Sequence, residues 1–503
     1  MTTQISGDLV DLDPKRWRAL IVIAIASLMV VLDAAIMNIA LPQAQQALHI
    51  STANRQWVVT SYTLVFGGFL LLGGRIGDYA GRKKAFIIGL VGFALASALG
   101  GFAQDQSMLL AARALQGVFG ALLAPAALSL ISVTFVNSEE RAKAFGVYGA
   151  ISGVGAAIGL IAGGLLTQFL NWRWCLFVNI PMALLAVGLA VPNVHESKIE
   201  GKTKYDVPGA ILSTLGFVSL VYGFTQAAQP GHSWGSTSTL VYLIGGGLLL
   251  IAFVIVELNV KQPLLPMSVL LNRVRAGSFI AQFFVAIGMF PMFLFMTFYF
   301  QQIHGWSPIH AGVSFLPFSL GVITSATVAS KLLPKIGPRP IATVGPIVGA
   351  LGMFWLSTLK PDSSYLTHVL PSLVMMSLGL GLAFVTVTAT SLFNVPFHQS
   401  GVASALQNQT GQIGGSLGTA LLNTIAVSTT AAYVIAHPWH GATLPAGMQP
   451  PDALVHGYSM AFRAGAISLF LAGVIYFLFV NVDREHLAQH DDVAAPGEAA
   501  HLG

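Results

Sequence analysis

The chain has 503 residues, of which 55% are hydrophobic and only 9% are charged, and its mean hydropathy is +0.74. Soluble proteins carry about 25% charged residues, so this composition excludes an ordinary soluble domain and predicts an all-helical polytopic membrane protein. The net charge of +5 would suit a nucleic-acid-binding protein, so the positions of the basic residues must be considered. The single cysteine, Cys175, excludes an internal disulfide and a multi-cysteine metal site.

Fourteen apolar runs approach or exceed the length of about 20 residues that a helix needs to cross a bilayer. In chain order, the expected spans are 19–41, 57–73, 85–103, 108–132, 144–168, 174–192, 208–226, 239–258, 277–300, 310–330, 340–358, 367–390, 402–428 and 461–481. The polar segment 1–18 lacks a signal-peptide cleavage pattern, so the first span is expected to stay as an anchor.

The basic residues alternate along these spans. With the N-terminus in the cytoplasm, nineteen of the 24 Lys and Arg residues fall in inside segments, whereas the outside segments hold only Arg55, Arg173 and Lys360. This distribution follows the positive-inside rule and predicts that both termini are cytoplasmic, in a protein of the inner (cytoplasmic) membrane. Orientation therefore explains the excess positive charge, and no nucleic-acid partner is expected.

A faint internal repeat suggests how the spans are grouped. Glycines recur at a separation of 256 residues, in the pairs Gly81 and Gly337, Gly155 and Gly411, and Gly159 and Gly415. The repeat predicts a six-helix bundle at 19–192, a cytoplasmic linker at 193–207, two inserted helices at 208–258, a second six-helix bundle at 259–481 and a cytoplasmic tail at 482–503. Parallel half-repeats around a midplane site are a known transporter plan.

One carboxylate, Asp33, lies well inside the first apolar run, where an ionised Asp costs about 2.5–3.5 kcal/mol. Arg113 lies in or at the edge of the fourth run. A buried anion and a buried cation relieve each other's cost by pairing. Two interpretations stay open: Asp33 takes up and releases a proton as its surroundings change, or the two residues form a permanent structural pair.

The segment GGRIGDYAGRKKAF after the second span sets Asp78 among several basic residues. Its pattern resembles the signature loop of the major facilitator superfamily, carried here by Gly74, Ile76, Asp78, Gly81, Arg82 and Lys83, with Ile76 in place of the usual Leu. Four further stretches, LDAAIMNIALP, RALQGVFGA, WRWCLFVNIP and GWSPIHAGVSFLP, resemble the 14-helix drug:proton antiporters of that superfamily. The resemblance covers residues 15 to 482.

The resemblance implies export by alternating access, in which a proton moves inward as the substrate moves out. It implies that Asp33 is the protonatable acid, that Arg113 is its basic neighbour, and that Gly74, Asp78, Gly81, Arg82 and Lys83 form a gating loop. The antiporter motif of the fifth helix is matched by Gly155, Gly159, Gly163 and Gly164, which predicts close helix packing. Leu160 replaces the Pro of that motif, so a weaker kink is expected and the direction of transport stays open.

Polar residues suggest where a substrate binds. Asn408, Gln412, Ser416, Thr419 and Asn423 have spacings that place them on one helix face, which lines a cavity or bonds to a neighbouring helix. Asn38, Tyr62, Gln116, Asn179 and Gln282 are further cavity candidates, although each alone is more often a packing residue.

Catalytic signatures are missing from the sequence. It has no P-loop, HExxH motif, Cys/His cluster or Ser-His-Asp candidate in a soluble domain. We therefore expect no enzyme activity, cofactor or metal, and an ion gradient as the energy source. The sequence predicts a proton-coupled exporter of small amphiphilic or cationic compounds that acts as a monomer. An importer or symporter of the same fold, and a non-transporting membrane receptor, are the alternatives.

Overall fold

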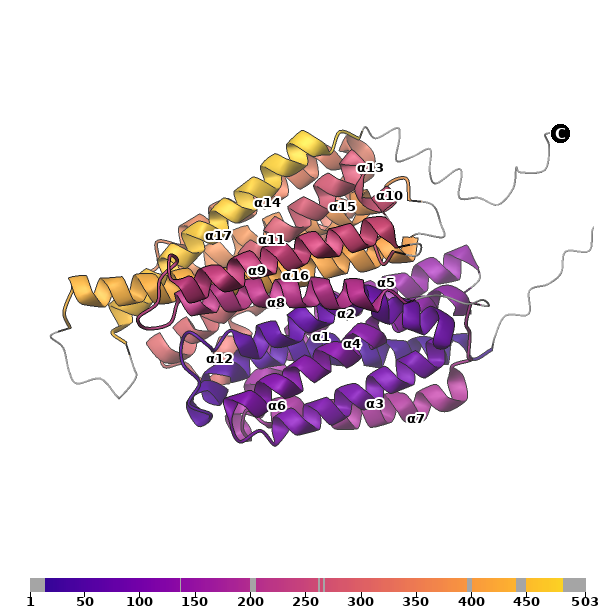
Figure 1. Ribbon diagram of the computed structural model, residues 1–503, viewed down its shortest axis with the longest axis horizontal. Coiled ribbons are helices and arrows are strands. Elements are labelled where there is room, and N and C mark those ends of the chain that lie inside the picture. Colours follow the sequence, from indigo (N-terminus) through magenta and orange to yellow (C-terminus); the bar gives the residue numbers. More distant parts are fainter. Residues whose placement is uncertain are drawn as a thin grey trace, which may run out of the picture.

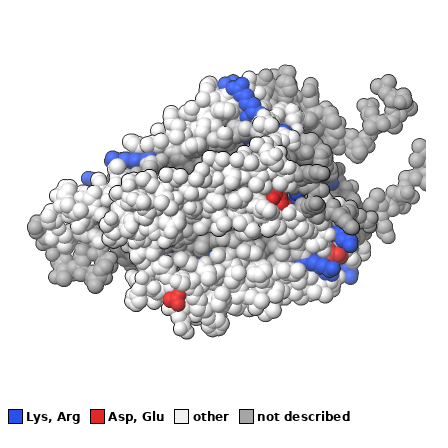
Figure 2. All heavy atoms as spheres, in the orientation of Figure 1, with Lys and Arg blue, Asp and Glu red and all other residues white. Residues whose placement is uncertain are grey.

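The computed structural model describes residues 14–135, 137–199, 205–260, 263–265, 267–395, 400–439 and 449–482, and these residues form helices and connecting segments. Fourteen helical stretches are long and apolar enough to cross a membrane, which confirms the predicted count. Figure 2 shows one face of the molecule with few Lys, Arg, Asp or Glu side chains, as a surface in contact with lipid requires.

The first seven helices pack into one group, in which α2 and α3 contact α4, and α1 contacts α5 and α7. Their bounds are α1 (Arg16–Ala47), α2 (Trp57–Ala80), α3 (Arg82–Gly101), α4 (Gln106–Thr134), α5 (Ser138–Phe169), α6 (Trp174–Phe177) and α7 (Asn179–Asn193). The expected sixth span is split, since the short α6 ends before α7 begins at Asn179.

A second group follows, in which α14 packs on α15 and α17, and α11 packs on α16 and α17. Its helices are α10 (Met267–Leu270), α11 (Arg273–Phe298), α12 (Pro308–Val313), α13 (Leu316–Ile336), α14 (Pro338–Leu356), α15 (Leu370–Ser391), α16 (Ser400–Ala436) and α17 (Pro451–Phe479), with π-helical turns at Tyr299–Ile303 and Tyr365–Val369. In Figure 1 this group lies largely above the indigo and purple helices of the first group.

The helices α8 (Val207–Ala227) and α9 (Thr237–Asn259) form a pair between the two groups. Their strongest contacts are with each other, and α8 also packs against α2 of the first group and α16 of the second. The inserted pair therefore lies along the seam where α2 meets α16.

Corresponding glycines of the repeat occupy corresponding places. Gly81 joins α2 to α3 with φ of +121°, and Gly337 joins α13 to α14 with φ of +77°. Only glycine adopts such dihedrals without steric cost, so each joint turns within a single residue. A Cβ on Gly159 would lie 2.7 Å from Ala35 of α1, and one on Gly415 would lie 2.7 Å from Phe290 of α11. Glycines thus let α5 approach α1 and α16 approach α11 in the same way.

Two segments that we expected to be irregular are helical. The segment from Gly73, which we expected to be a loop, forms the last part of α2. Gly73 and Gly74 allow α2 to pack closely on α4, since a Cβ on Gly73 would lie 2.1 Å from the carbonyl oxygen of Ala121. The connection between the expected spans 402–428 and 461–481 is shorter than expected, because α16 continues to Ala436 and α17 begins at Pro451. Proline suits the first turn of a helix and Asp452 complements its dipole there.

The two groups are tied together toward one end of the bundle. We call the end where α1 begins and α17 ends the termini end, and the opposite end the far end. Hydrogen bonds between the groups join Gln301 Nε2 to the Ile39 carbonyl oxygen at 2.9 Å and Thr63 Oγ1 to Ser416 Oγ at 2.6 Å. A Cβ on Gly312 would lie 2.4 Å from the Leu160 carbonyl oxygen, so α12 and α5 touch backbone to backbone. These contacts lie from the middle of the bundle to the far end.

Candidate functional site

Asp33 lies at the centre of a buried polar network inside the first group. Its exposed fraction and that of Arg113 are both 1%, and Arg113 NH1 donates to Asp33 Oδ2 at 2.6 Å. The other oxygen, Oδ1, accepts from Gln116 Nε2 at 2.9 Å and from Asn179 Nδ2 at 2.7 Å. Three donors therefore compensate the buried charge of one carboxylate, as a buried ion needs.

Arg113 is held from several sides. Its Nε donates to the Val58 carbonyl oxygen at 3.1 Å, and its NH1 also donates to Gln116 Oε1 at 2.7 Å. The guanidinium carbon lies 4.5 Å from the centre of the Tyr62 ring, a cation–π arrangement. The network thus draws on α1, α2, α3, α4 and α7, because Ser97 of α3 accepts from Gln116 Nε2 at 2.7 Å.

The local sequence explains this convergence. Arg113 and Gln116 are three residues apart on α4, so they lie on the same helix face. Asn179 begins α7 directly after the short α6, and this break places its amide beside α1. Gln116, Asn179 and Tyr62 were predicted as cavity residues; in this structure they surround the ion pair instead.

The other cavity candidates lie elsewhere. Asn38 is half-buried and donates to the Ala34 carbonyl oxygen of its own helix. Gln282 of α11 lies beside Gly411 of α16, where a Cβ would be 3.2 Å from Gln282 Nε2. Gln412 keeps a buried oxygen, Oε1, without a partner among the described residues, and Asn408 is exposed.

The polar face of α16 separates into two parts. Ser416 bonds Thr63 of α2, and Asn423 accepts from Arg55 Nε at 3.2 Å, so this part makes interhelical hydrogen bonds. Gln412 and Asn408 lie nearer the termini end, where Asn408 Nδ2 donates to the Ser404 carbonyl oxygen of its own helix.

Arg55 is a residue whose role the sequence did not indicate. It belongs to the segment between α1 and α2, yet only 2% of its surface is exposed. Its guanidinium carbon lies 4.1 Å from the ring centre of Phe298 and 5.8 Å from that of Tyr458, both in the second group. A cation of the first group is therefore inserted between aromatic rings of the second group at the far end.

The signature loop forms a network at the termini end. Arg82 Nε donates to Asp78 Oδ1 at 2.9 Å, and Lys83 Nζ donates to the Val191 carbonyl oxygen at 2.8 Å. Glu196, which the sequence analysis did not single out, accepts from the backbone N–H groups of Lys83 and Lys84 at 3.0 and 3.1 Å. The linker after α7 thus caps the start of α3. In the same region the hydrogen bond from Arg16 lowers the pKa of the Glu140 carboxyl.

Replacing Glu196 by Ala should destabilise the protein by about 1 kcal/mol, the typical worth of a helix cap. The reason is that two N–H groups at the start of α3 would lose their acceptor. Thermal unfolding in detergent, compared with Glu196→Gln, measures the effect. The Gln variant keeps a side-chain oxygen and should lose much less; equal losses in both variants would show that capping is not what Glu196 contributes.

The fifth-helix glycines face two partners. A Cβ on Gly155 would lie 3.1 Å from Leu28, and one on Gly163 would lie 3.1 Å from Ile36, both on α1. A Cβ on Gly164 would lie 2.7 Å from Ile309 Cα of the second group. Leu160 is buried, and α5 continues through it as one helix.

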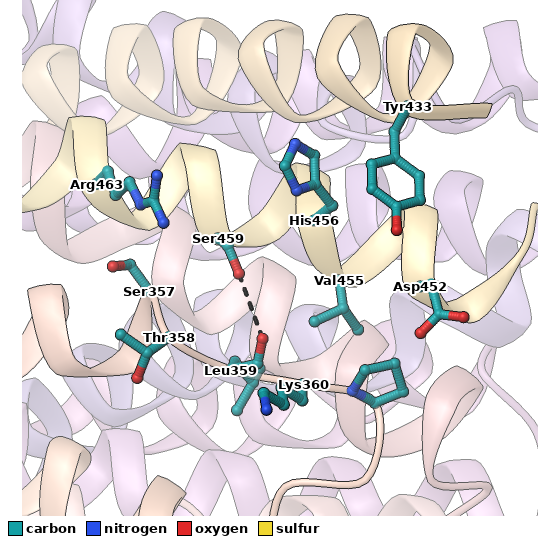
Figure 3. Close-up of a pocket in the computed structure, with 11 residues that line it drawn as sticks. Ser357, Thr358, Leu359, Lys360, Tyr433, Asp452, Val455, His456, Ser459 and Arg463 are labelled. Atoms are coloured by element: carbon teal, nitrogen blue, oxygen red, sulfur yellow. Dashed lines mark hydrogen bonds between the residues drawn. The ribbon is translucent and has the colours of Figure 1, made fainter. Parts of the chain in front are cut away.

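A separate pocket of about 270 Å³ lies at the far end, between α16, α17 and the segment after α14 (Figure 3). Lys360, Asp452, His456 and Arg463 line it, so its charges are mixed. Figure 3 shows Ser459 bonded to the Leu359 carbonyl oxygen, at 3.5 Å. None of the sequence-predicted site residues lines this pocket.

Fourteen membrane-spanning helices form two groups with an inserted pair between them, and an ion pair is occluded inside the first group. This arrangement defines a polytopic membrane transporter. The family model "Major Facilitator Superfamily" matches residues 23–419, and the chain belongs to this family. It is therefore a multi-pass membrane transporter of small molecules and not an enzyme, and the predicted family and fold class are confirmed.

Relatives and solved structures agree. The chain is 46% identical to the puromycin resistance protein pur8 of Streptomyces alboniger, over 94% of this chain and 93% of the relative. It is 36% identical to the cephamycin export protein CmcT of Amycolatopsis lactamdurans, over 82% and 85%. The crystal structure of the POT family transporter PepTSo superposes with a TM-score of 0.66 at 15% identity, over 94% of this chain and 99% of that one, and supports the fold.

Proposed function

We propose that the protein exports small amphiphilic or cationic compounds, antibiotics among them, across the inner membrane by exchange for protons. The observation that carries this proposal is the occluded pair of Asp33 and Arg113, surrounded by Gln116 and Asn179. The relatives, a puromycin resistance protein and a cephamycin export protein, support the substrate class.

In the proposed cycle, Asp33 exchanges its partner for a proton. While Arg113 is bound, the charge of Asp33 is compensated and no proton is needed. When the helices rearrange and Arg113 moves away, the buried anion loses its counter-ion, and uptake of a proton removes this cost. An inward-moving proton also gains about 2.3 kcal/mol per 100 mV of membrane potential.

We further propose that the termini end faces the cytoplasm, in line with the positive-inside distribution. The groups are tied at the far end, so the structure would correspond to a state closed toward the outside. The substrate cavity would lie between the groups, where Gln282, Gln412 and Asn408 of the second group lie closer to the termini end. Gln412 Oε1 has no hydrogen-bond partner among the described residues and is free to accept one from a cationic substrate.

Within the same proposal, one chain suffices, with a first bundle at 19–192 and a second at 259–481. The gating loop consists of Gly74, Asp78, Gly81, Arg82 and Lys83. Its hydrogen bonds join α2, α3 and the linker at the termini end, where the two groups separate and close during transport.

A panel of antibiotics tests the proposed substrate class. Cells that express the protein should grow at higher concentrations of some amphiphilic or cationic compounds than cells that do not, and everted vesicles should accumulate those compounds when a proton gradient is present. Accumulation that a protonophore leaves unchanged would contradict proton coupling.

Import or symport in the same fold is the second candidate, and Leu160 is the observation that favours it, because the antiporter motif has Pro there. The direction of substrate flux under a fixed proton gradient separates the two candidates.

A further inference from the structure

Two buried carboxyl groups lie at the termini end of the inserted helices. Asp206 caps the start of α8 and Glu257 lies near the end of α9, with exposed fractions of 3% and 2%. One oxygen of each has a backbone donor: the Gly209 N–H donates to Asp206 Oδ1 at 2.9 Å, and the Leu265 N–H donates to Glu257 Oε2 at 3.0 Å. The other two oxygens, Asp206 Oδ2 and Glu257 Oε1, are buried with no hydrogen-bond donor among the described residues.

These two unpartnered oxygens converge beside Gly209. A Cβ on that glycine would lie 2.5 Å from Asp206 Oδ2 and 3.0 Å from Glu257 Oε1, so a larger residue would not fit between them. The side chains of Asp206 and Glu257 are also within hydrogen-bonding reach of each other. An ionised carboxylate only accepts hydrogen bonds, so the two groups bond to each other only if one of them carries a proton.

The charges around the two carboxyl groups are balanced when one of these groups is protonated. Arg75 of α2 is the charged residue of a neighbouring helix that acts on Glu257, and its NH2 donates to the Pro263 carbonyl oxygen at 2.6 Å. From α16, Val402 and Ala405 pack against the apolar cluster that contains Leu264 and Ala210. Among the residues that the structure describes, one cation therefore faces the two carboxyl groups and balances one negative charge. Two like charges buried side by side share a proton.

We propose that Asp206 and Glu257 form a second proton-binding site, in which one proton is shared between Asp206 Oδ2 and Glu257 Oε1 at neutral pH. Proton loss would leave two adjacent anions, which would repel each other and draw Arg75 away from Pro263. Because Pro263 lies on the segment from α9 to the second group and Arg75 lies on α2, the proton stabilises a link between the two groups. The site does not depend on Asp33 and would exist even if transport were not driven by protons.

Infrared difference spectroscopy on the purified full chain in lipid nanodiscs tests the proposal. In an Asp33→Asn/Arg113→Gln background, the C=O band of one protonated carboxylic acid should be present at neutral pH and should disappear on alkaline titration. Glu257→Gln should remove this band, and Asp206→Asn should remove or shift it. Asp105→Asn is the matched control, because Asp105 is an exposed cap and Asn can cap the same helix.

Absence of a protonated-acid band at neutral pH in the Asp33→Asn/Arg113→Gln protein would overturn the proposal, whether or not the other variants fold. A band that survives both Glu257→Gln and Asp206→Asn would do the same. If exchanging choline chloride for sodium chloride removes the band, the pair binds a metal cation in preference to a proton, and the proposal also fails.

Discussion

Replacing Asp33 by Asn together with Arg113 by Gln should abolish proton-driven export while leaving the protein folded. Neither new side chain is charged, so neither leaves a buried ion without its partner. The amide oxygen at position 33 can still accept from Gln116 and Asn179. The single variant Asp33→Asn should be less stable by about 3–5 kcal/mol, because removal of one partner of a buried pair leaves the other uncompensated. Export assays in everted vesicles and thermal unfolding measure the two effects separately.

This comparison distinguishes the two interpretations of the pair. If Asp33 and Arg113 only stabilise the bundle, the neutral pair should restore both stability and export. If Asp33 carries the proton, stability returns but export stays at background. Gradient-driven export by the double variant at the wild-type rate would therefore rule out the coupling role.

Replacing Arg55 by Leu should shift the protein toward a state that is open at the far end. The buried guanidinium contacts Phe298 and Tyr458 and donates to Asn423, all in the second group. A desolvated cation–π contact is worth about 2 kcal/mol, which corresponds to a shift of about thirtyfold in the equilibrium. The loss of the bond to Asn423 adds to this shift.

A cysteine at Thr419 reports the opening. Thr419 is buried and donates to the Gly415 carbonyl oxygen of its own helix, and its spacing places it on the same face of α16 as Ser416 and Asn423. In a Cys175→Ala background, a membrane-impermeant maleimide applied from the outside should label this cysteine much faster when Arg55 is Leu. Arg173→Ala is the control, because Arg173 bonds the Gly101 and Ala103 carbonyl oxygens inside the first group. Equal acceleration in both variants would show that Arg55 does not hold the two groups together.

The membrane topology was predictable because one free-energy cost, that of placing charged side chains in lipid, dominates it. Apolar length and the alternation of basic residues determine the fourteen spans, because water and lipid sort side chains strongly. The ion pair of Asp33 and Arg113 was predictable for the same reason, since each charge is costly in a membrane without the other. The glycines of α2 were misread as a loop, because the sequence does not tell whether glycine serves a turn or close packing.

Residues whose role depends on a distant partner could not be predicted. Ser97 was missed because a serine in a membrane helix often bonds its own backbone. In the sequence, Glu196 is one of several charged residues of a linker. It caps α3 by accepting from backbone N–H groups that lie more than a hundred positions away in the chain. Arg55, Asp206 and Glu257 lie at the ends of spans, where charges are ordinary, and only the packing of helices shows that they are buried.

Proton movement during transport tests the central claim most directly. The purified protein is reconstituted into liposomes that contain a pH-sensitive dye, and a transported compound is added on one side. Wild type should move protons against the substrate, whereas Asp33→Asn/Arg113→Gln should exchange substrate for substrate without moving protons. Equal proton movement in both proteins, or proton movement in the direction of the substrate, would contradict it.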